Sequence, residues 1–365
     1  MKNSIPKKFK KSIEYESKIK KINFLDGHIS YKSFNLANNE DVAILIHGTG
    51  AHKHWWDPLA PQISDIGTII VPDLPGMGDS SHFKKYDFDL FMQSLLTVMG
   101  EEKIENKNIY LIGHSLGGHL AAYLASERPE LIKGIIIIDS PIRPPDYDYS
   151  KHINSGPLRP IKFYDSRKEI LSRFRLMPPQ ETNNQWYLDY IAKYSIIMSK
   201  DGWRWKFDDR MFTSMTRLDD YGFKFSCPAL FIAGGKSLLL NDEIMNYMQD
   251  KFSSIMQFAT INNAAHHVLI DEPDILLDLI NKKWKSGDDV ELSIEYECMP
   301  EIPKFDLSKL VLDNLVVEPD KKSLDDAMKS VQESSPEYQT GKKGTKSKKK
   351  DQVILDFEGF IDGEP

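Results

Sequence analysis

The 365-residue sequence has only two cysteines, Cys227 and Cys298, which lie far apart in the chain. Two distant cysteines give neither a disulfide framework nor a metal-ligand pattern, so we expect a reducing compartment and no metal or other cofactor. No apolar run is long enough to cross a membrane, and the lysine-rich residues 1–21 lack the apolar segment of a secretory signal. We therefore expect a cytoplasmic protein.

Strong charge of one sign is also missing. The net charge of −7 at pH 7 gives no general affinity for DNA or RNA, so we expect no nucleic-acid partner. The lysine tract at 341–350 is interpreted as solvated and disordered, with nucleic-acid binding by this tract as the alternative. A hydrophobic fraction of 41% supports one large domain with additional segments, and composition does not indicate an oligomeric state.

Short continuous apolar runs recur along the chain, which is typical of strands buried on both faces of a parallel sheet. They lie at 42–46, 67–71, 109–112, 134–138, 228–233 and 256–261. Helical patterns separate them, with predicted helices starting near Asp87 and Asn241 or Asp242 and another over 271–284. An Asp26-Gly27 turn predicts a β-hairpin over 22–35. The alternation predicts an α/β fold with a mostly parallel sheet flanked by helices.

One segment stands between a buried strand and an Ala-rich, buried helix. It reads Gly113-His114-Ser115-Leu116-Gly117, a G-x-S-x-G pattern. A tight strand-to-helix turn of this kind strains the serine backbone and leaves no room for side chains at the glycines. It also lifts the hydroxyl to a helix N-terminus, where free N–H groups stabilise negative charge. The competing interpretation is that Ser115 only caps the helix.

The strand–helix rhythm divides the chain. We expect a basic N-terminal arm at 1–21, poorly ordered, and an α/β core formed by 22–140 and 226–285. Prolines, aromatics and helical patches at 141–225 predict an inserted helical cap. Residues 286–365 are a charged extension, partly disordered, in which the alternation from Val290 to Cys298 indicates an added edge strand.

From Ile22 to Trp284 the sequence resembles the α/β-hydrolase superfamily. Four features occur in the order of that family, and together they carry the resemblance. They are His47-Gly48, Asp73-Leu-Pro-Gly-Met-Gly-Asp-Ser80, Gly113-His-Ser-Leu-Gly-Gly118, and a histidine after the last strand. The resemblance implies the α/β-hydrolase fold, with catalytic groups on loops at the carboxyl ends of the strands.

The resemblance also implies the roles of individual residues. Ser115 would be the nucleophile, and His266 would be the base, with His267 as the less favoured rival. The backbone N–H groups of Thr49 and Leu116 would form the oxyanion hole. Predicted substrate contacts are His47, His114, Trp186 and Trp203.

The triad acid departs from the usual pattern of the family. The loop after the strand at 228–233 carries Ser237 and Leu238 where a carboxylate is expected. A minority of the family places the acid after the preceding strand, and Asp139 ends that strand here. We therefore favour Asp139, with Asp242 as the alternative. A helix-cap role for Asp242 and a purely structural role for Asp139 compete with these assignments.

The predicted function is that of a serine hydrolase acting on a carboxylic ester or thioester, with an apolar or aromatic portion in its small-molecule substrate. A carbon–carbon bond hydrolase with the same triad is one alternative. A non-catalytic homologue that binds a ligand is a second, since fold does not determine function. A third is a protein that interacts with partners through its extension.

Overall fold

The computed structural model describes residues 4–148, 162–211, 222–284 and 320–334, and a few positions between 341 and 353. It consists of two compact units, Met1–Leu292 and Ser293–Pro365, each of which is considered by itself. None of the helices in these described ranges combines the length and the apolar composition needed to cross a bilayer.

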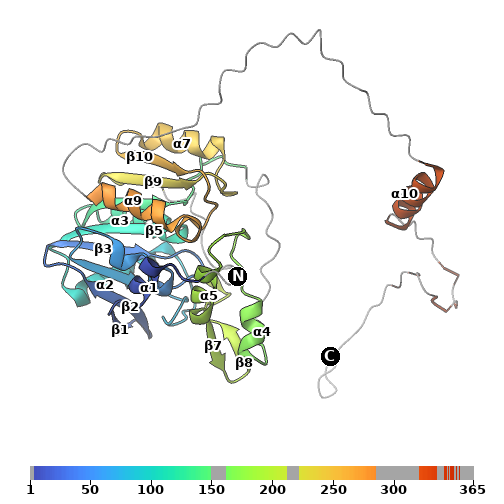
Figure 1. Cartoon of the computed structure of the whole chain (residues 1–365), viewed down its shortest axis with the longest axis horizontal. Coiled ribbons are helices and arrows are strands. Elements are labelled where there is room, and N and C mark those ends of the chain that lie inside the picture. The colour runs from blue at the N-terminus through green and yellow to red at the C-terminus, as the bar shows by residue number, and fades with distance from the viewer. Residues whose placement is uncertain are drawn as a thin grey trace, which may run out of the picture. The chain divides into compact units, whose positions relative to one another are not determined.

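The first unit is built on an eight-stranded sheet with the order β1-β2-β4-β3-β5-β6-β9-β10 (Figure 1). The pairs β1–β2 and β2–β4 are antiparallel, and all the following pairs are parallel. The predicted hairpin and all six predicted buried strands are therefore confirmed. The strands are β1 (Lys18–Phe24), β2 (Gly27–Asn35), β3 (Asp41–Ile46), β4 (Thr68–Pro72), β5 (Asn108–His114), β6 (Ile132–Ile138), β9 (Ala229–Gly234) and β10 (Met256–Ile261).

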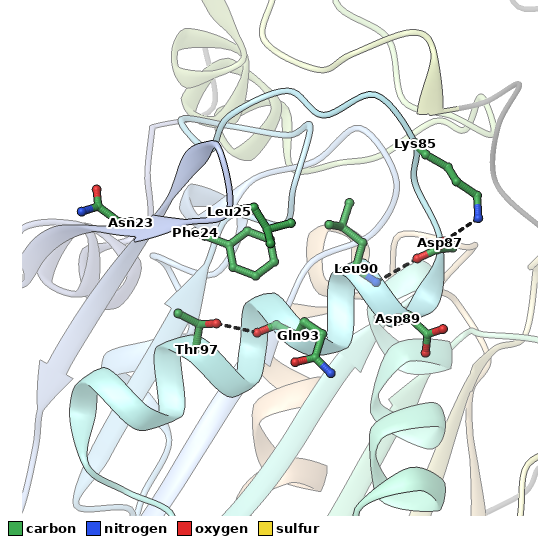
Figure 2. Close-up of a pocket in the computed structure, with 9 residues that line it drawn as sticks. All are labelled: Asn23, Phe24, Leu25, Lys85, Asp87, Asp89, Leu90, Gln93 and Thr97. Atoms are coloured by element: carbon green, nitrogen blue, oxygen red, sulfur yellow. Dashed lines mark hydrogen bonds and ion pairs between the residues drawn. The ribbon is translucent and has the colours of Figure 1, made fainter.

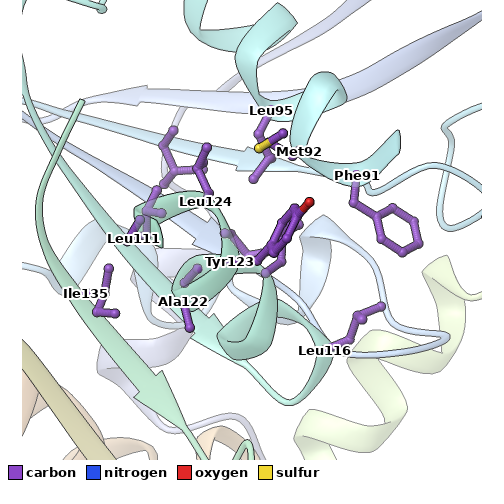
Figure 3. Close-up of a cluster of buried hydrophobic side chains, with 14 of the residues drawn as sticks. Phe91, Met92, Leu95, Leu111, Leu116, Ala122, Tyr123, Leu124 and Ile135 are labelled. Atoms are coloured by element: carbon purple, nitrogen blue, oxygen red, sulfur yellow. The ribbon is translucent and has the colours of Figure 1, made fainter. Parts of the chain in front are cut away.

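Each central strand sends alternate side chains into two apolar cores, one on each face of the sheet. In β6, Ile135 and Ile137 enter one core, whereas Ile136 and Ile138 enter the other. The first core is closed by α2 (Phe88–Glu102), α3 (Leu116–Glu127) and α7 (Asp242–Phe252). The second is closed by α1 (Lys7–Ile13), α8 (Val268–Asp271), α9 (Pro273–Trp284) and the short 3-10 helices η1 (Lys53–Trp55) and η2 (Ala60–Gln62). Figure 3 shows part of the first core, where side chains of α2 and α3 meet those of β5 and β6.

Two predicted helix starts are confirmed by their caps. Asp87 accepts a hydrogen bond from the Leu90 N–H at 2.9 Å, and Asn241 accepts one from the Ile244 N–H at 3.0 Å. Each cap is worth about 1 kcal/mol. Of the two candidates for the start of α7, Asn241 is the cap, and Asp242 is an exposed residue of the first turn.

The N-terminal segment differs from the expected loose arm. Residues 7–13 form α1, and β1 begins at Lys18. Phe9 is buried and stacks on Trp186, with 5.2 Å between ring centroids. The packing of Phe9 thus holds α1 in place, although the lysine-rich sequence around it is typical of a solvated N-terminal arm.

The cap also differs from the prediction of a mostly helical insert. It contains α4 (Arg167–Ser172) and α5 (Gln185–Tyr194), but also a hairpin of β7 (Ile196–Ser199) and β8 (Gly202–Trp205). The hairpin turns at Gly202, whose φ of +120° suits only glycine. Residues 149–161 and 212–221 of the predicted cap lie outside the described residues.

The second unit is described chiefly by α10 (Lys321–Ser334). Its side chains Leu324, Met328 and Val331 follow helical spacing and are more than half exposed. The predicted edge strand from Val290 to Cys298 lies outside the described residues, as does part of the lysine tract at 341–350.

Candidate active site

The predicted nucleophile sits on a strained turn between β5 and α3. Ser115 has φ 54° and ψ −119°, a conformation that few residues other than glycine adopt. A Cβ added at Gly113 would lie 2.1 Å from the Gly117 carbonyl oxygen, and one added at Gly117 would lie 2.3 Å from that of Ile46. Only glycine fits at either position, so the sequence pattern and the strand-to-helix turn agree.

A histidine and an aspartate from two different strand ends meet beside this turn. His266 follows β10, and its Nδ1 lies 2.7 Å from Oδ2 of Asp139. Asp139 directly follows β6, is fully buried and has φ 49°. The Ser115 N–H donates to the carbonyl of Ile138, the last residue of β6. The Ser115 turn and Asp139 are therefore both attached to the end of β6.

The Asp139 carboxylate is held by two further donors. The Gly234 N–H donates to Oδ1 at 2.8 Å, and the Ser237 hydroxyl donates to Oδ2 at 2.6 Å. Three hydrogen bonds fix the carboxylate in the orientation that faces His266. Ser237 stands where the usual family pattern has the acid, and sequence reasoning did not assign it a role. The predicted alternative, Asp242, is exposed on α7 and has no described bond to His266.

The two predicted oxyanion donors belong to elements that meet at Ser115. Leu116 is the first residue of α3, where N–H groups have no intrahelical partner, and the N–H groups of Gly118 and His119 already bond to the Ser115 carbonyl. The Gly48-Thr49 loop packs directly on the turn, because a Cβ at Gly48 would lie 3.1 Å from the Ser115 Cβ.

His47 joins two loops below the site. Its Nδ1–H donates to the Gly48 carbonyl at 2.8 Å, and its Nε2 accepts from the Leu74 N–H at 3.0 Å. Burial lowers the pKa of His47, which keeps the ring neutral in this arrangement. Both ring nitrogens are used within the protein, so the contact predicted between His47 and substrate has no nitrogen left to make it.

A buried ion network braces the same loops. The Lys53 ammonium lies 2.6 Å from both Asp73 and Asp79, and Lys206, which follows β8 of the cap, lies 2.5 Å from Asp79. Burial disfavours the charged ammonium, but the two carboxylates outweigh it and raise the pKa of Lys53. The network thereby holds η1, the loop after β4 and the segment after β8 together.

Helix α5 is anchored to the core through η1 and its flanks. The Tyr187 hydroxyl donates to the Trp55 carbonyl at 2.7 Å, and that of Tyr190 donates to Asp57 at 2.6 Å. His52 Nε2 lies 2.9 Å from the hydroxyl of Ser195 just after the helix. These buried bonds give the cap helix a fixed position over the sheet.

The structure puts the two predicted cap tryptophans in packing positions. Trp186 is buried between Phe9 and Tyr187, and Trp203 is a half-buried strand residue paired with Met198. Among the described interactions, neither ring contacts Ser115, His266 or Asp139. Phe207 lies against the loop that carries Gly50, because a Cβ at Gly50 would lie 3.7 Å from its Cδ1.

His114 and His267 flank the predicted base. His114 Nε2 lies 2.9 Å from the His266 carbonyl, and the His267 backbone N–H donates to Gln180 Oε1. Asp271 accepts from the Ala265 N–H at 2.8 Å and from Gln180 at 2.7 Å, which holds the loop of both histidines. His267 makes no described contact with a carboxylate, unlike His266.

A groove of about 520 Å³ lies elsewhere, between the β1–β2 turn and α2 (Figure 2). Its lining includes Phe24, Leu25 and Leu90 together with the charged side chains of Lys85 and Asp87. None of the predicted catalytic residues lines it, so it does not define the active site.

Comparison with known proteins agrees with this architecture. A family model described as alpha/beta hydrolase fold matches residues 42–152. A suspected esterase/lipase of Haemophilus influenzae is 25% identical over 270 residues, which cover 71% of this chain and 92% of that protein. The thioesterase domain from the curacin biosynthetic pathway superposes with a TM-score of 0.60 at 20% identity, covering 73% of this chain and 99% of the domain. The first unit thus has the α/β-hydrolase fold, as the resemblance implied.

A second similarity covers only a short part of the chain. The trigger factor of Ruegeria pomeroyi is 42% identical over 86 residues, which cover 24% of this chain and 19% of that protein. The chain therefore spans about a fifth of the length of the trigger factors that it matches.

The buried histidines make the stability of the fold depend on pH. Burial lowers the pKa of His47 and lowers that of His52 further. Below about pH 6.5 the unfolded chain therefore binds protons at these histidines that the folded chain does not bind. Stability is therefore present above this pH and is lost as the pH falls, by up to about 1.4 kcal/mol per pH unit for each histidine. Urea unfolding at about pH 7.5 and about pH 5.5 measures this slope, and His52→Gln should make it shallower. Equal stability at both pH values would contradict the prediction.

Proposed function

We propose that the chain is a serine hydrolase that cleaves carboxylic esters or thioesters through an acyl-enzyme on Ser115. The hydrogen bond from His266 Nδ1 to Asp139, next to the strained Ser115 turn, is the observation that carries the proposal. Asp139 accepts this bond from Nδ1–H, so the lone pair of the neutral imidazole is on His266 Nε2, where it can act as a base.

In the proposed reaction, His266 Nε2 takes the Ser115 proton as the hydroxyl attacks the substrate carbonyl. Asp139 stabilises the imidazolium that forms, and the N–H groups of Leu116 and Thr49 donate to the oxyanion. His266 then protonates the leaving alcohol or thiol. Water, deprotonated by His266, releases the acid and restores the serine.

Two observations favour an ester or thioester with an apolar portion. The relatives include a suspected esterase/lipase and a thioesterase domain. The cap also brings the Phe207 ring beside the oxyanion loop, where it offers an apolar surface to the group that flanks the scissile carbonyl. The alternatives of carbon–carbon bond cleavage and of ligand binding without catalysis use the same residues and are separated by experiment.

Labelling by a fluorophosphonate probe tests the nucleophile. The wild type should react at Ser115, and Ser115→Ala should lose labelling and ester hydrolysis, because only an activated serine attacks the probe. Ser254→Ala removes an exposed hydroxyl and serves as the control with full labelling. A folded wild type that stays unlabelled would refute the hydrolase proposal and favour the non-catalytic one.

The acid is tested with a pair of charge-neutral variants. Asp139→Asn should reduce kcat of a p-nitrophenyl ester by about 10³–10⁴, because an amide presents the wrong partner to the imidazole. Asp242→Asn, on exposed α7, should leave kcat unchanged. Ser237→Ala keeps the carboxylate but removes one hydrogen bond, and should cost about tenfold. The reverse ranking of the two aspartates would overturn the assignment of Asp139.

We also infer that the trigger-factor similarity belongs to the extension after Trp284. The trigger-factor matches span 81 to 89 residues, and residues 285–365 are 81 in number, so the longer matches would also include a few residues before Lys285. The suspected esterase/lipase covers 71% of the chain and the trigger factors 24%, so the two together account for nearly all of it. The chain then combines a hydrolase unit with a segment of a second protein type.

Truncation tests this division. A chain that ends at Leu292 contains the first compact unit with every proposed catalytic residue. It should keep the kcat/KM of the full chain to within about twofold, because no proposed step uses the extension. Loss of ester hydrolysis in a truncated chain with unchanged circular dichroism would contradict the division and favour a role of the extension in catalysis.

A further inference from the structure

Three histidine rings cluster at the proposed base. His114 and His266 have ring centroids 4.7 Å apart, His266 and His267 4.8 Å, and His114 and His267 5.4 Å. One nitrogen from each ring lies within 4.8 Å of the other two, and all three side chains are buried. The proposed mechanism uses only His266.

The hydrogen bonds around the rings determine which nitrogens carry lone pairs. His114 Nε2 faces the His266 carbonyl, which only accepts, so Nε2 is protonated and Nδ1 is not. His266 Nδ1 faces Asp139 and is protonated, so its Nε2 is free to bind.

Several of these nitrogens are buried without a hydrogen bond. Within the described part of the chain, His114 Nδ1 and both ring nitrogens of His267 make no hydrogen bond of good geometry, although the backbone carbonyls of Met177 and Pro178 lie near the His267 ring. A buried polar atom left unsatisfied costs about 1–3 kcal/mol, so native proteins usually provide a water, an ion or a ligand for it. A cation that accepts lone pairs from all three rings would remove this cost.

We propose that His114, His266 and His267 form a binding site for a Zn²⁺-class transition-metal ion, which inhibits the enzyme by occupying the lone pair of the base. Imidazole nitrogens suit Zn²⁺, Cu²⁺ and Ni²⁺. Asp139 adds a carboxylate behind His266, the arrangement that strengthens histidine as a metal ligand. Zn–N distances of about 2.1 Å put the nitrogens roughly 3.4 Å apart, so metal binding must draw the three rings closer together than they are in this structure.

The inhibitory effect rests on the proposed function, but metal binding does not. Calorimetry with ZnCl₂ and visible absorption with CoCl₂ therefore come first, on the full chain freed of metal with a chelator. One ion per chain should bind to the wild type and to Ser115→Ala, which has no hydrolytic activity. The matched variant His267→Gln should weaken binding at least about tenfold, whereas His82→Gln, at an exposed histidine, should not.

The second readout is ester hydrolysis. Zn²⁺ should inhibit the wild type reversibly, and EDTA should restore the rate. His267→Gln, compared with its own metal-free rate, should need at least about tenfold more Zn²⁺ for the same fractional inhibition. Absence of Zn²⁺ binding, or binding that His267→Gln leaves unchanged, would overturn the proposal and leave a bound water as the partner of these nitrogens. Zn²⁺ binding in a chain that hydrolyses no ester would support the site and refute only the proposed catalytic function.

Discussion

The hydrogen bond between Asp139 and His266 is the contact on which the candidate site depends. It joins the end of β6 to the loop after β10, two segments separated by more than a hundred residues and by strand β9. The sheet makes this possible, because parallel strands bring their carboxyl ends to one edge. The intervening strand takes part as well, since Gly234 and Ser237 donate to the same carboxylate.

Buried charge elsewhere in the first unit has a related positioning role. The carboxylate of Asp57 binds Lys32, His54 and Tyr190, and Asp73 binds Lys53 together with two backbone N–H groups. Such groups are costly to bury and are tolerated when every lone pair has a donor. Their directional hydrogen bonds hold the loops and the cap in one geometry, whereas apolar contacts alone would define that geometry less strictly.

The sequence was sufficient for the core and for the pairing of Asp139 with His266, which the structure joins by a hydrogen bond. Continuous apolar runs such as 134–138 have no other stable place than a sheet covered on both faces. The sequence was insufficient where one contact between residues far apart in the chain determines the local structure. In the sequence of α1, only Phe9 indicates a packed helix, and its partner Trp186 is far away in the chain. Strand β7 has four residues, which are too few for an alternating pattern to be recognised. The hydrogen bond of Ser237 to Asp139 joins residues 98 positions apart. His47 and Trp186 looked available because sequence does not reveal which polar groups are already paired.

The position of Ser237 has a consequence for where the acid of such a site can be anchored. Its hydroxyl touches the Asp139 oxygen that bonds His266, so a carboxylate at 237 would reach the same imidazole. The two strand ends are thus interchangeable anchor points around one base. In the proposed triad, an acid anchored on either strand end would therefore serve the same histidine.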